Sequence, residues 1–184
     1  MDKEKIEELK SKRMELKEEV RLSNLRERVA LQIAHLEKLK YPYSVYYDFK
    51  NLNWIEANVR VRNRDGYKGI HGDFQIDVDD SNVINSLTIS EIEIDSEKFK
   101  NQFLSLISTD SSLIVCYQGG DPELEISLKA FLDKPSLFFS SPETWILTSD
   151  KNWIIEYVWD QGVIRFIKLE ELIPRLIKKI TINY

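Results

Sequence analysis

The sequence has few of the residues from which common catalytic and metal centres are built. Its single cysteine, Cys116, excludes an intramolecular disulfide and a thiolate-rich zinc site. Two histidines, His35 and His71, are too few for most histidine-based metal centres. Gly119-Gly120 lacks the Lys-Ser/Thr that follows a phosphate-binding loop, and the chain has no Gly-x-Ser-x-Gly motif. These gaps disfavour an enzyme, and we expect no catalytic residue, metal or cofactor.

Long apolar runs are also missing from the sequence. None approaches the roughly 20 residues that a membrane-spanning helix needs, so we expect no membrane segment. The first twelve residues alternate in charge, whereas a secretory signal has a basic segment followed by an apolar one. The expected compartment is therefore the cytoplasm.

Positive charge is scarce in most of the chain. The net charge of −5 divides unevenly, because residues 1–40 hold eleven Lys/Arg against nine Asp/Glu, which leaves fifteen against twenty-two for residues 41–184. Nucleic-acid binding depends on clustered Lys and Arg, so nucleic acid is an unlikely partner for this acidic part. A basic protein partner suits it better.

The N-terminal segment is predicted to be helical, because Asp2 to Lys40 contains no glycine or proline and is rich in good helix formers. Two apolar stripes follow three-four spacing in it. The first stripe is Ile6, Leu9, Leu16 and Val20, with Arg13 in the missing apolar place, and the second stripe is Leu22, Leu25, Val29, Leu36 and Leu39. Since the stripes are out of phase, we expect a helical hairpin or one long helix whose buried face rotates. The predicted division is a helical segment over 1–41 and an acidic α+β domain over 42–184.

From Tyr43 onward the hydrophobic period changes to two, which is typical of half-buried strands. Strands are predicted over 43–49, 54–62, 73–79, 87–95, 113–117, 144–148, 153–159 and 163–168. Further helices are predicted over 96–107, 122–132 and 170–180. The expected fold class is α+β: an N-terminal helical hairpin or long helix, followed by a mainly antiparallel β-sheet with about three packed helices.

The most distinctive candidate site is acidic. If the strands over 73–79 and 87–95 pair as a hairpin, five carboxylates project from one solvent face. They are Asp77, Asp79, Glu91, Glu93 and Asp95. Arg60 and Arg62 on an adjacent strand would neutralise some of them, which is a purely structural arrangement; otherwise the face predicts a docking surface for a basic protein.

Aromatic residues are concentrated in the C-terminal strands. Trp153, Tyr157 and Trp159 share one face of their predicted strand. Such a cluster has two interpretations. It can pack in the core, or it can form an interface in which aromatic anchors lie beside an acidic rim. We therefore include these three side chains with the five carboxylates as candidate partner-binding residues.

The sequence favours a protein-binding module, in the specific form of a cytoplasmic immunity-type or antitoxin-type inhibitor that covers a basic partner such as a nuclease. Two alternatives stay open. A magnesium-dependent hydrolase or phosphotransfer enzyme would use Asp73, Asp77 and Glu91 or Glu93. A self-associating structural or assembly protein would form a homodimer through the first stripe.

Overall fold

The computed structural model describes residues 3–59, 61–63, 74–76, 83–88, 93–117, 120–139, 143–158 and 162–169. In these residues the fold class is α+β, as predicted. The helices are α1 (Lys3–Arg28), α2 (Ala30–Lys38), α3 (Lys50–Asn58), α4 (Glu97–Leu106), α5 (Leu128–Asp133) and α6 (Pro135–Phe138). The strands are β1 (Tyr43–Tyr46), β2 (Val61–Asn63), β3 (Phe74–Ile76), β4 (Val83–Thr88), β5 (Ser112–Tyr117), β6 (Glu123–Ser127), β7 (Glu143–Thr148), β8 (Trp153–Val158) and β9 (Val163–Lys168). The predicted helix over 170–180 lies outside the described residues.

Seven described strands form one antiparallel sheet in the order β1-β6-β5-β7-β8-β9-β4, and β2 pairs with β3 in a separate ladder. The predictions for β5, β7, β8 and β9 are confirmed. Gly162, with a φ of +58°, ends the connection between β8 and β9, where glycine is the residue best suited to this conformation. Since β8 lies between β7 and β9 with both faces covered, its sequence is apolar on both sides.

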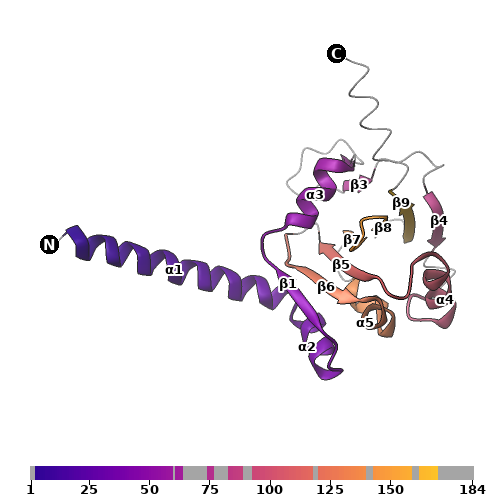
Figure 1. The fold of residues 1–184 in the computed structure, drawn as a ribbon, viewed down its shortest axis with the longest axis horizontal. Helices are drawn as coiled ribbons and strands as arrows, with labels where there is room; N and C mark the ends of the chain where they lie inside the picture. Colours follow the sequence, from indigo (N-terminus) through magenta and orange to yellow (C-terminus); the bar gives the residue numbers. More distant parts are fainter. Residues whose placement is uncertain are drawn as a thin grey trace, which may run out of the picture.

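Both faces of the large sheet are covered, with α3 and β3 on one side and α2 and α5 on the other (Figure 1). One face packs against α2, α4, α5 and α6. Aromatic rings fill much of this core, where the centroid of Phe103 lies 5.0 Å from that of Phe131 and 5.4 Å from that of Phe166. The other face packs against α3 and β3 through Ile55 and Ile76. The sheet is thus the middle of three layers, and apolar burial on both sides stabilises it.

The predicted strand over 54–62 is wrong for most of its length, because residues 50–58 form helix α3. Leu52, Ile55 and Val59 are buried at i, i+3 and i+7, which is helical spacing. In a strand over 54–62, Ala57 would lie on the same buried face as Ile55 and Val59, but its side chain is exposed. The segment fits both periods, and burial against the sheet selects the helix.

A distant carboxylate caps the start of α3. Glu123 on β6 is fully buried and accepts hydrogen bonds from the backbone N–H of Leu52 at 2.6 Å, and from the backbone N–H and side-chain amide of Asn51 at 3.3 and 2.7 Å. Negative charge at a helix N-terminus satisfies otherwise unpaired N–H groups. No local sequence signal could reveal a cap that comes from another part of the chain.

The predicted helix over 122–132 is corrected in its first half, which is strand β6. Leu124 and Ile126 face the helix-covered core, while Glu123 points to the opposite face beneath α3. Helix α5 begins only after Ser127, whose side chain caps it. Asp121 followed by Pro122 is a typical helix start, but pairing of β6 with both β1 and β5 overrides it.

Of the two arrangements predicted for the N-terminal segment, a hairpin or a long helix, the long helix is confirmed as α1; it breaks at Val29, and α2 starts a new direction (Figure 1). The two apolar stripes have different surroundings. In the second stripe, Leu25, Val29 and Leu36 are buried, and α2 contributes to the main core. The first stripe lies on the part of α1 that extends away from the sheet.

Candidate interaction surface

The hairpin on which the predicted acidic face depends does not form in the described residues. Strand β3, within 73–79, pairs with β2, whereas β4 pairs with β9. The strand predicted over 87–95 does not extend to its end, because the chain makes a turn before α4 there. The described parts of the two acidic segments therefore do not pair with each other.

Two of the five carboxylates lie in the described part of the chain. Asp95 accepts hydrogen bonds from the backbone N–H of Ser136 at 2.8 Å and from its hydroxyl at 2.6 Å, so it caps the first turn of α6. Glu93 is exposed in the loop before α4. The predictions that lie outside the described residues are Asp77, Asp79 and Glu91, together with Arg60 and the side chain of Arg62.

The described aromatic candidates are packed inside the protein. Tyr157 is 9% exposed, and its ring centroid lies 5.3 Å from that of Phe139. Trp153 is partly buried against the same core. Trp159 lies outside the described residues. Trp153 and Tyr157 thus take part in the core on the helix-covered face of the sheet.

A buried ion pair, which the sequence interpretation missed, ties the small ladder to the large sheet. The Glu156 carboxylate is 1% exposed and accepts hydrogen bonds from Arg165 Nε at 2.7 Å, the Ile76 backbone N–H at 2.7 Å and Trp145 Nε1 at 3.1 Å. Arg165 Nη2 also binds Glu156 and donates to the Ile76 carbonyl at 2.9 Å. Burial raises the pKa of Glu156, while the Arg165 charge opposes that rise. With these donors engaged, the pair acts as a clamp between β3, β8 and β9.

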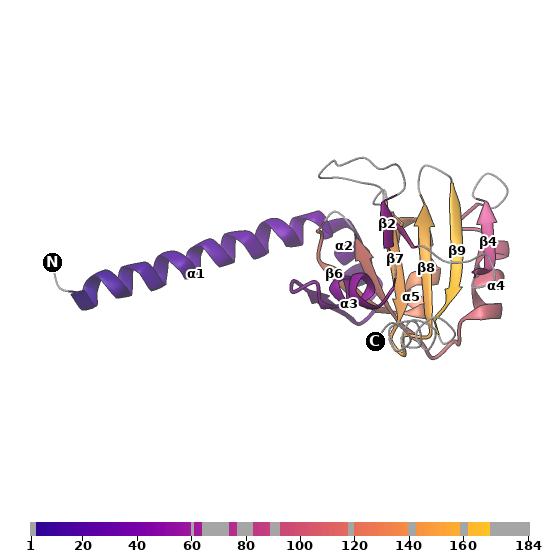
Figure 2. The same ribbon diagram turned by 90° about the horizontal axis from the view of Figure 1, so that it is seen from above.

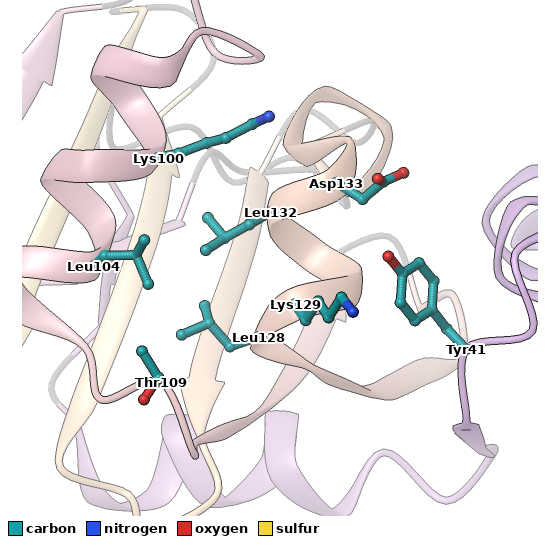
Figure 3. Close-up of a pocket in the computed structure, with 8 residues that line it drawn as sticks. All are labelled: Tyr41, Lys100, Leu104, Thr109, Leu128, Lys129, Leu132 and Asp133. Carbon is teal, nitrogen blue, oxygen red and sulfur yellow. The ribbon is translucent and has the colours of Figure 1, made fainter.

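A shallow groove of about 350 Å³ lies between α4 and α5, beside Tyr41 (Figure 3). Leucine side chains from both helices face each other across it, and two of its three charged side chains form ion pairs. Lys100 pairs with Glu97 at 3.0 Å, and Asp133 pairs with His35 at 3.2 Å. The lining brings together no nucleophile and base, so the groove has the character of a contact surface.

Metal and thiol chemistry find no support in the described residues. No group of three or more His, Cys, Asp or Glu side chains in that part of the chain could hold a metal ion. Asp73, Asp77 and Glu91 of the magnesium alternative lie outside it. Cys116 is fully buried, and burial raises the pKa of its thiol well above the ordinary value, so it behaves as a small core residue.

Helix α1 forms an arm that extends away from the sheet (Figures 1 and 2). Its 26 residues span about 39 Å at about 1.5 Å per residue. The base of the arm is fixed by Leu25 and Val29, which are buried, and by an ion pair between Arg28 and Asp121 at 3.2 Å. Most of the arm is therefore held out from the body by contacts at one end.

The first stripe is exposed along this arm. Leu9, Leu16 and Val20 are 56%, 61% and 59% exposed, and Ile6 is partly exposed. Ion pairs one turn apart support the helix, such as Lys12 with Glu8 at 2.7 Å. Apolar residues at a and d heptad positions are the pattern by which one helix packs on another. The structure thus presents an apolar seam with no partner among the described residues.

No protein family, curated protein or solved structure matches the chain. None of the helices in the described ranges is both long and apolar enough to cross a membrane.

Proposed function

We propose that the protein is a protein-binding module whose α1 arm docks on a helix of another polypeptide. The observation that carries the proposal is the first stripe, whose three-four spacing runs along a helix that leaves the body. A helix that lays an apolar seam against another helix is a common mode of recognition. The second stripe shows the contrast, because three of its five members, Leu25, Val29 and Leu36, are buried against the body.

The size of the stripe limits the strength of such a complex. Complete burial of a Leu or Val side chain stabilises by about 1.5–3 kcal/mol. Association costs about 4–15 kcal/mol in lost translational and rotational freedom. Four apolar side chains therefore support a reversible complex, and flanking charges would decide its specificity.

The inhibitor form of the proposal, in which an acidic surface covers a basic protein, depends on a different set of residues. Glu93 and Asp95 are its described members, and Asp95 is engaged with Ser136. The arm carries the more direct argument, because its apolar side chains are exposed together on one helix.

An affinity capture from the native lysate with matched variants tests this function. We expect the full chain to retain a stoichiometric protein that Leu9→Asp/Leu16→Asp loses. Met14→Asp is the control, because Met14 is 71% exposed on the same helix but lies off the stripe. Circular dichroism should show equal helix content in all three proteins. Capture that is unchanged by the double substitution, or no stoichiometric protein with any of them, would overturn the proposal.

A further inference from the structure

The charges beside the first stripe are sorted by sign. In a heptad that places Ile6 at position a, the flanking e and g positions hold Lys5, Lys10, Lys12 and Lys17, all exposed. At about 100° of rotation per residue, these lysines lie within about 80° of the axis of the stripe. Arg13 occupies an a position within the stripe itself. The seam is therefore bordered and interrupted by positive charge.

The glutamates of the arm lie mainly on its opposite side. Glu7, Glu8, Glu15 and Glu18 are about 120–160° from the axis of the stripe. Glu19 is the exception, because it occupies a g position beside the stripe, near the base of the arm. Although α1 has similar numbers of basic and acidic residues, the basic residues border the first stripe and most of the acidic residues lie on the opposite side of the helix.

This arrangement disfavours a second copy of the chain as the partner. In a parallel in-register pair, Lys5 would face Lys10 of the second copy, and Lys12 would face Lys17. Reversing one helix still brings two basic borders together and places Arg13 in the apolar seam. Such a pair would have to bury like charges beside a short seam.

We propose that the partner of α1 is an acidic amphipathic helix, with apolar residues along its seam and Asp or Glu at both flanks. This inference rests on the proposed function and names the chemistry of the partner. The flanking carboxylates would pair with the four lysines, and a seam carboxylate would pair with Arg13. Charge complementarity would then favour this helix over other apolar helices.

The base of the arm has room for such a helix to continue. Ser23 and Glu27 extend the three-four spacing of the stripe into a groove of about 300 Å³ between α1 and α2. Ala30 and Ala34 contribute small side chains on the α2 side. Glu27 and Glu37 also line this groove, so a partner helix long enough to reach it would need uncharged or basic residues at that end.

Two synthetic peptides of about three heptads test the inference, with identical Leu and Ile seams but flanked by Glu or by Lys. In fluorescence anisotropy with the full chain, we expect the Glu-flanked peptide to bind at least about tenfold more tightly. Lys10→Glu/Lys17→Glu should reverse this preference. Lys98→Glu/Lys134→Glu makes the same change in net charge on exposed body positions and should leave the preference unchanged.

The other outcomes separate this inference from the proposed function. Equal binding of both peptides, or binding of neither, would overturn the acidic partner, while the lysate capture would still decide whether the stripe binds a protein. Sedimentation equilibrium of the full chain alone should show a monomer at tens of micromolar. A dimer that Leu9→Asp/Leu16→Asp dissociates would identify a second copy as the partner and contradict the inference.

Discussion

Replacing Arg165 by methionine is expected to destabilise the protein by about 3–5 kcal/mol, because it leaves the buried Glu156 carboxylate without its ion partner. The Ile76 carbonyl would lose a donor in the same step. Urea unfolding at neutral pH measures the change in the free energy of unfolding. A change smaller than about 0.5 kcal/mol would show that the clamp contributes little to stability.

The loss should depend on pH. Burial already raises the pKa of Glu156 above 4.5, and removing the guanidinium takes away a cause that lowers it. The folded variant would then retain a proton that the unfolded chain releases, so its stability falls as pH rises above about 4.5. Arg165→Met/Glu156→Leu is the control, because it removes the unpaired charge and should abolish most of this added pH dependence.

Alanine substitutions in the two stripes should have very different costs. Leu36 of the second stripe is fully buried, so its replacement by alanine is expected to lower the free energy of unfolding by about 2–5 kcal/mol. Leu16, in the first stripe, should change stability by less than about 0.5 kcal/mol, because its side chain is 61% exposed. Chemical denaturation of both variants checks this. A comparable loss at Leu16 would mean that the first stripe packs within the protein.

Local pattern was enough to predict the fold class and much of the sheet. The strands from β5 to β9, apart from β6, have apolar runs or alternation that matches their burial. The helix predicted from residue 96 is confirmed as α4, which the side chain of Ser96 caps. The sequence did not predict α3 or β6, because both are decided by partners distant in the chain. Glu123 illustrates this, since one carboxylate belongs to β6 and caps α3.

The candidate site was predictable in part. Both stripes are visible as three-four spacing, but spacing alone cannot distinguish the stripe that packs on the body from the one that is exposed. The lysines beside the first stripe could have been found by placing Lys10 and Lys17 on a helical wheel. The described parts of the acidic segments pair with other strands, because strand order depends on contacts that alternation does not encode.

Hydrogen–deuterium exchange on the full chain, alone and with the Glu-flanked peptide, tests the central claim most directly. We expect amides over 6–20 to exchange faster than those of α2 in the isolated protein, because no described part of the body packs against them. Adding the peptide should slow exchange over 6–20. If these amides are already as protected as those of α2, and the peptide changes nothing, α1 is not an open docking arm.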